Sequence, residues 1–135
     1  MRQFLYKVLF IFSLGFMLPQ MVLAAQISFD AKTTQAQVGK KFEVTLFVDT
    51  EQENINAFEG KVIFPSNFLD LKEIQDGNTI VNFWIEKPKA QDNAITFSGV
   101  TPGGFNGKKG LIFSAIFEAK KEGLAKLEVH DARIL

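Results

Sequence analysis

The sequence predicts an all-β fold, a jelly-roll β-sandwich of about eight to nine strands, preceded by a signal peptide. Apolar residues recur with a period of two after residue 25, and turn-forming residues separate these runs. The chain also holds fifteen Phe among 135 residues. Aromatic side chains fit the pleated, half-buried surface of a sheet. No segment after residue 25 keeps the periodicity of an amphipathic helix.

Residues 1–24 have the three parts of a secretory signal peptide. Arg2 and Lys7 supply the positive charge, residues 8–18 form an apolar run, and residues 22–24 place small or apolar side chains before a cleavage site. We predict cleavage after Ala24, or as a second choice after Ala25.

The alternative for this segment is an uncleaved membrane anchor. A spanning helix needs about 20 apolar residues, and reaching that length here would include Pro19 and Gln20. With either outcome the remaining chain lies outside the cytoplasm, secreted or at the cell surface. The membrane is then contacted only through this N-terminal signal or through an anchor beyond the C-terminal end.

The strand prediction rests on alternation. Phe42, Val44, Leu46 and Val48 alternate with more polar neighbours, as in a half-buried strand. The predicted strands are, in order, residues 27–29, 42–48, 55–64, 69–74, 81–86, 94–99, 111–120 and 124–129. Predicted turns lie between them, at residues 38–39, 65–67, 76–78, 102–104, 106–107 and 122–123, where Gly, Pro and Asn gather.

Charge and composition exclude several functions. The chain has 15 basic and 15 acidic residues, so no basic surface points to nucleic acid as a partner. There is no Cys, which excludes disulfides, thiolate metal sites and cysteine nucleophiles.

The segments that follow residue 25 occur in an order that resembles the cohesin domain family of bacterial extracellular proteins. The resemblance covers residues 26–135, which we take as one cohesin-like domain. It rests on residues 38–44 (VGKKFEV), 55–65 (INAFEGKVIFP), 68–71 (FLDL), 95–99 (ITFSG), 110–120 (GLIFSAIFEAK) and 122–125 (EGLA). Cohesins are similar in fold to the β-sandwiches of carbohydrate-binding modules. Because cohesins complete their last strand, the resemblance also implies that residues 132–135 end a truncated domain.

No residue pattern predicts catalysis or a cofactor. His130 is the only histidine, and alternation places it on the solvent side of a strand without a nucleophile beside it. The carboxylates at strand ends include no defined glycosidase pair. The loop of residues 49–54 is rich in oxygen ligands but lacks the spacing of a known calcium loop, so no metal site is predicted. We therefore expect a protein that is not an enzyme.

Four residues are candidate ligand-binding residues. Trp84 would suit sugar stacking or a protein hot spot if its strand face is exposed, whereas the alternative is that it packs beneath a loop. Glu59 matches an acidic residue on the sheet face with which cohesins bind dockerins, and alternation turns Glu59 and Lys61 away from the core. Phe105 lies in a glycine-rich loop as a candidate exposed anchor.

The leading hypothesis is an exported, non-catalytic, cohesin-like binding module that engages a polysaccharide or a dockerin-like protein. The alternatives are a carbohydrate-binding module proper, and a structural adhesin or surface-layer module without a specific ligand.

Overall fold

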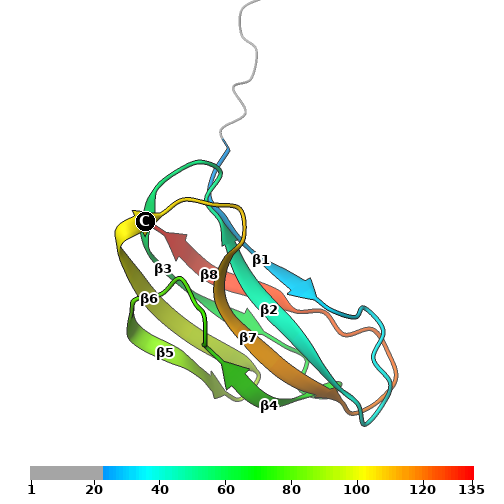
Figure 1. Cartoon of the computed structure of the whole chain (residues 1–135). Coiled ribbons are helices and arrows are strands. Elements are labelled where there is room, and N and C mark those ends of the chain that lie inside the picture. The colour runs from blue at the N-terminus through cyan, green and yellow to red at the C-terminus, as the bar shows by residue number, and fades with distance from the viewer. Residues whose placement is uncertain (1–22) are drawn as a thin grey trace, which may run out of the picture.

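The computed structural model describes residues 23–135, which form two antiparallel four-stranded sheets packed face to face (Figure 1). Residues 1–22 of the predicted signal peptide lie outside the described residues. The eight strands are β1 (Gln26–Ala31), β2 (Lys41–Asp49), β3 (Ile55–Ile63), β4 (Leu69–Gln75), β5 (Phe83–Gln91), β6 (Ala94–Phe105), β7 (Gly110–Ala119) and β8 (Glu128–Ile134). The predicted β-sandwich is confirmed.

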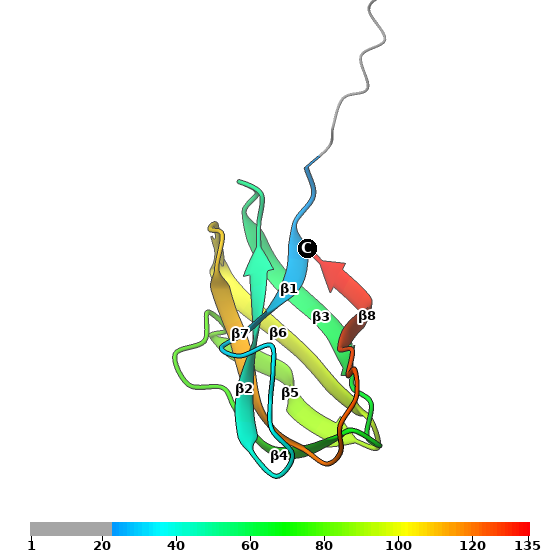
Figure 2. The same ribbon diagram turned by 90° about the vertical axis from the view of Figure 1, so that its right-hand side faces the viewer.

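Sheet A has the strand order β1-β2-β7-β4, and sheet B has the order β5-β6-β3-β8. Every pairing is antiparallel. The edge strands β1 and β8 come into contact along one side of the sandwich (Figure 2). Sheet B therefore presents one face to sheet A and its other face to solvent.

The core forms where alternate residues of both sheets point inward. Val44, Leu46 and Val48 of β2 are buried, as their alternation predicts. Aromatic rings connect the two sheets: Phe97 of β6 and Phe113 of β7 meet edge to face with centroids 5.4 Å apart. Because the chain has no cysteine, no disulfide crosslinks the two sheets, and the packing of apolar side chains holds them together.

Three predicted boundaries are wrong. β5 is Phe83–Gln91 instead of residues 81–86, and β8 is Glu128–Ile134 instead of residues 124–129. The apolar Leu124, which favoured the earlier start of β8, is exposed and joins no strand. β6 continues to Phe105 through the predicted turn at residues 102–104, because Gly103 and Gly104 adopt positive φ angles and distort the strand without ending it.

Candidate functional site

The site lies on the solvent-facing side of sheet B, around two residues that the sequence selects. Phe58 and Val62 of β3 are buried, and the residues that alternate with them, Glu59 and Lys61, face away from the core. The predicted orientation of both charged residues is therefore confirmed. Glu59 lies opposite Ser98 of β6, and Lys61 lies opposite Thr96.

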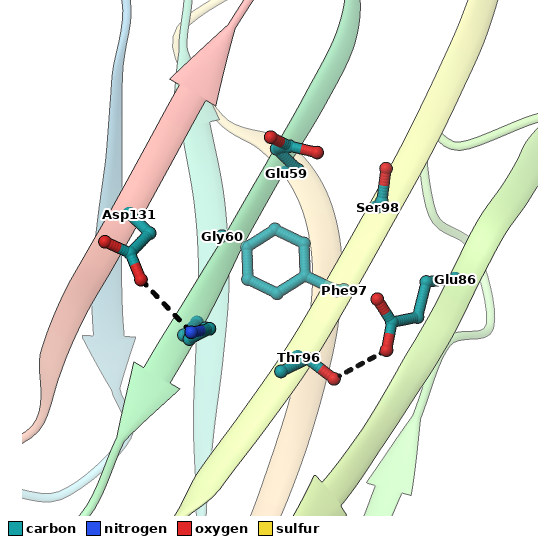
Figure 3. A pocket seen from close by; sticks show the side chains of 8 residues that line it. Glu59, Gly60, Glu86, Thr96, Phe97, Ser98 and Asp131 are labelled. Atoms are coloured by element: carbon teal, nitrogen blue, oxygen red, sulfur yellow. Dashed lines mark hydrogen bonds and ion pairs between the residues drawn. The ribbon is translucent and has the colours of Figure 1, made fainter.

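The centre of this face is hollow (Figure 3). The hollow has a volume of about 240 Å³, and its lining includes Glu59, Lys61, Glu86, Thr96, Ser98 and Asp131. The buried ring of Phe97 also lines it, beside Gly60 of β3, which has no side chain. The hollow is open because the residues that β6 turns to this face, Thr96 and Ser98, have short side chains. The longer side chains of β3, β5 and β8 surround them as walls.

Ion pairs hold the charged walls in place. Lys61 Nζ lies 3.2 Å from Asp131 Oδ2 (Figure 3), and Arg133 of β8 pairs with Glu59. These side chains are between about one third and three quarters exposed, so each pair contributes little to stability. A charged partner can therefore exchange with either member of a pair at small cost.

Glu86 of the hollow is held in its ionised form by two neighbouring side chains. The Thr96 hydroxyl donates a hydrogen bond of 2.8 Å to Glu86, and Lys89 Nζ lies 3.2 Å from the same oxygen. The Thr96 hydrogen bond first, and then the Lys89 ammonium, lower the pKa of Glu86 below the usual value of a glutamate. Glu86 therefore keeps its negative charge at pH values at which an ordinary glutamate begins to take up a proton.

Trp84 is not the exposed platform that one interpretation of the sequence requires. It is partly buried, packs against the core and lies opposite the inward-facing Gly99. A β-bulge between Trp84 and Glu86 breaks the alternation of β5, so Glu86 lies opposite the outward-facing Ser98. The neighbours of Trp84 are the exposed residues instead: Phe83 is 64% exposed and Ile85 is 68% exposed.

Phe105 is likewise not a free anchor. It ends β6 opposite Ile55 and packs against the core. Gly110 makes room for its ring, since a Cβ at position 110 would lie 2.5 Å from Phe105 Cε1. The structure thus brings Glu59 and Lys61 together on one face and separates Trp84 and Phe105 from it.

Sequence reasoning missed Glu86, Thr96, Ser98 and Asp131. Thr96 and Ser98 could have been found, because they alternate with the apolar Ile95 and Phe97 and must therefore face solvent. Glu86 and Asp131 could not, because each lies next to an irregularity in strand pairing that no residue pattern marks.

His130 and the acidic residues form no reactive cluster. His130 Nε2 lies 2.8 Å from Glu128 Oε2 on the exposed face of β8. Between residues 23 and 135, no three His, Asp or Glu side chains gather closely enough to hold a metal ion, and this range includes the oxygen-rich loop 49–54. Nor does any helix in the same range have the length and apolar character needed to cross a membrane.

A second hollow, of about 500 Å³, opens near β1 and the segment that leads into β8. Its apolar lining includes Phe29, Phe42, Phe68, Leu124 and Leu127, with Lys121 and Glu122 among its polar residues. We refer to it below as the β1 groove.

No family model and no curated protein sequence matches the chain. Solved structures do match, and several of them are cohesins. A non-cellulosomal cohesin from Archaeoglobus fulgidus has a TM-score of 0.65 at 15% identity, covering 81% of this chain and 77% of that chain. The sixth cohesin of Acetivibrio cellulolyticus scaffoldin B, solved with a Cel5 dockerin mutant, has a TM-score of 0.65 at 14% identity, covering 83% and 86%.

The chain has the cohesin fold. A cohesin module from a Clostridium perfringens family 33 glycoside hydrolase supports this, with a TM-score of 0.60 at 14% identity over 84% of this chain and 96% of that chain. The resemblance drawn from the sequence is therefore confirmed at the level of the fold.

Proposed function

We propose that this chain is an exported, non-catalytic module that captures a dockerin-like protein on the solvent-facing side of sheet B. One observation carries the proposal: the charged hollow around Glu59 and Lys61 lies beside the exposed apolar residues Phe83 and Ile85 on the same sheet. Charged residues that surround an exposed apolar area are typical of a protein interface. The sixth scaffoldin B cohesin of Acetivibrio cellulolyticus was solved in complex with a dockerin.

Export to the cell surface or the medium forms part of the same proposal. It rests on the composition of residues 1–24, which have a positively charged start, an apolar run and small or apolar residues before a cleavage site.

A polysaccharide ligand has less support. Trp84, the residue that the sequence selects for sugar stacking, is partly buried against the core. A purely structural role would not require the exposure of Phe83 and Ile85.

The decisive experiment titrates the purified chain by calorimetry with dockerin modules and, separately, with soluble polysaccharides. The dockerins include the Cel5 dockerin of Acetivibrio cellulolyticus. We expect a dockerin to bind, and we expect Glu59→Lys to weaken that binding by about tenfold or more, because charge reversal opposes a complementary partner.

Glu43→Lys is the matched control. Glu43 lies on sheet A and pairs with Lys32, much as Glu59 pairs with Arg133 on sheet B. This variant should bind within about twofold of the parent chain. Saturable polysaccharide binding with no affinity for any dockerin would refute the proposal.

A further inference from the structure

The β1 groove has the size of a small-molecule binding site. Its volume of about 500 Å³ lies within the range of about 300–1,000 Å³ that is typical of ligand pockets. It lies where the connection between β1 and β2, residues 32–40, meets the connection between β7 and β8, residues 120–127, at one end of the sandwich (Figure 1). No residue lines both this groove and the hollow on sheet B. A ligand of the groove is therefore independent of the proposed dockerin.

The floor of the groove is apolar and its mouth is polar. Every strand residue of the lining is apolar, and two of them, Val44 and Leu69, belong to the buried core. The polar residues of the lining all lie in the two connections. They are Thr33, Thr34, Lys121 and Glu122. This arrangement fits a ligand with an apolar body and a polar end.

The charges of the two connections indicate that the polar end of the ligand is an anion. Residues 32–40 and 120–127 together contain five Lys and one Glu. The other residues between positions 25 and 135 contain eight basic and fourteen acidic side chains, so positive charge is concentrated around the groove. Lys32 and Lys126 pair with carboxylates, whereas the described part of the chain gives Lys121 no ion-pair partner. An anionic ligand would supply one.

Lys121 lies at the boundary between the floor and the mouth. Its Nζ is 4.9 Å from the centroid of the Phe68 ring, which forms part of the groove wall. The backbone N–H of Lys120 donates a 2.8 Å hydrogen bond to the Phe68 carbonyl. Gly123 lies so close to the ring that a Cβ there would collide with Phe68 Cε1. Residues 120–123 are thus held against Phe68, and this fixes the backbone on both sides of Lys121.

Leu124 borders the groove with almost all of its side chain in water. It is 93% exposed although it contributes to the lining. Contact with an apolar ligand in the groove would remove this side chain from water, which is favourable. Leu124 is therefore placed to cover a ligand from the solvent side.

We propose that the β1 groove binds a single-chain anionic amphiphile of the fatty-acid type. The alkyl chain lies on Phe29, Phe42 and Phe68, the head group pairs with the ammonium of Lys121, and Leu124 packs over the chain. A single molecule is favoured over a membrane surface, because the three Phe side chains are partly buried in a recess and do not protrude far enough to enter a bilayer.

The first test titrates the ¹⁵N-labelled chain with dodecanoate below its critical micelle concentration. We expect saturable shifts of amides in residues 29–34 and 119–127. Dodecanoate should bind about tenfold more tightly than dodecyltrimethylammonium, which has the same alkyl chain but a cationic head group that meets only Glu122 at the mouth. Octanoate should bind about tenfold or more weakly than dodecanoate, because each buried methylene strengthens binding by up to about fourfold. Equal affinity for the two head groups, or no binding of dodecanoate, would overturn the proposal.

The second test uses two variants with matched controls, all at exposed positions where the fold should be unaffected. Lys121→Gln should weaken dodecanoate binding by about fivefold or more, whereas Lys109→Gln should not. Lys109 is the matched control because its Nζ also lies over an aromatic ring, that of Phe47 at 5.6 Å, but outside the groove. Leu124→Ser should weaken binding by about threefold, whereas Ile85→Ser on sheet B should not. Binding that is insensitive to Lys121→Gln and Leu124→Ser would contradict the assigned site.

Vesicles separate this ligand from a membrane. If the chain binds phosphatidylglycerol vesicles but not monomeric dodecanoate, the basic end of the domain docks on a bilayer and the proposal is wrong. Dodecanoate shifts centred on Phe83 and Ile85 would also refute it, because these exposed side chains of β5 would then hold the alkyl chain. Shifts confined to the groove and reduced in Lys121→Gln would support it.

Discussion

Two phenylalanines of this chain have opposite environments. Phe117 of β7 is fully buried, and its ring contacts those of Phe42 and Phe64 at centroid distances of 6.0 and 5.2 Å. Phe83 of β5 is 64% exposed. Phe side chains therefore occur both in the packed core and on the exposed surface of the domain.

We expect Phe117→Ala to lower the free energy of unfolding by about 3–5 kcal/mol, because it leaves a cavity between the two sheets. Phe83→Ala should change it by less than about 0.5 kcal/mol, because the ring is mostly exposed. Urea unfolding followed by circular dichroism measures both. Similar losses for the two variants would mean that Phe83 packs into the core.

At the residue scale, the sequence predicted which way a side chain faces wherever polar and apolar residues alternate without interruption along a strand. Glu59 and Lys61 face solvent as expected, because β3 alternates regularly around them. The environment of Trp84 stayed open, because the bulge beside it shifts the alternation by one residue. A bulge depends on backbone pairing with β6, and a single strand's residue pattern contains no record of it.

At the scale of elements, the start of β5 and the residues just before it pack closely on the inner side of β6 at Gly99. A Cβ at position 99 would lie 2.8 Å from Val81 Cγ1 and 3.3 Å from Trp84 Cε3. Gly99 thus allows Trp84 and Val81 to pack against the sheet.

Gly99→Ala should cost about 1–3 kcal/mol of stability, because the β-branched Val81 has little freedom to move away. The double variant Gly99→Ala/Val81→Ala should lose less than the sum of the two single variants, since removing the Val81 methyls makes room for the new Cβ. A thermodynamic cycle from urea unfolding tests this coupling. Simple additivity would show that the close approach is not a constraint.

The presence of each strand was easier to predict from the sequence than its first and last residues. Each of the eight predicted segments overlaps an observed strand, and the prediction for β2 matches closely. β8 begins later than its apolar pattern suggests, because residues 121–125 and Leu127 line the β1 groove instead of pairing with β3. Pairing partners decide such boundaries, and they are distant in sequence.

For the whole molecule, the exposed charges set the response to acid. Hydrogen bonds from Lys32, Lys72, Thr96 and His130 are the main causes that lower the pKa values of Glu43, Asp70, Glu86 and Glu128, in that order. The unfolded chain therefore binds more protons than the folded one as pH falls through the carboxyl range. The contribution of these carboxylates to the free energy of unfolding is fully present above that range and is lost below it.

We expect the urea midpoint to stay constant between about pH 7 and pH 5.5 and to fall steadily towards about pH 3. Repeating the series at about 1 M NaCl should reduce the slope, because these pairs are solvent-exposed and screened by salt. An unchanged midpoint at the acid end would contradict the assigned carboxyl pairs.

The strand order determines how much of the chain must be synthesised before sheet A can form. β2 lies between β1 and β7, and Lys41 pairs with Glu118 near the far end of the chain. During synthesis β2 has only β1 as a neighbour, and a two-stranded ribbon is marginally stable alone. Sheet A therefore closes only after β7 has left the ribosome. This delay leaves the apolar strands β1 and β2 open to other nascent chains until β7 has been synthesised.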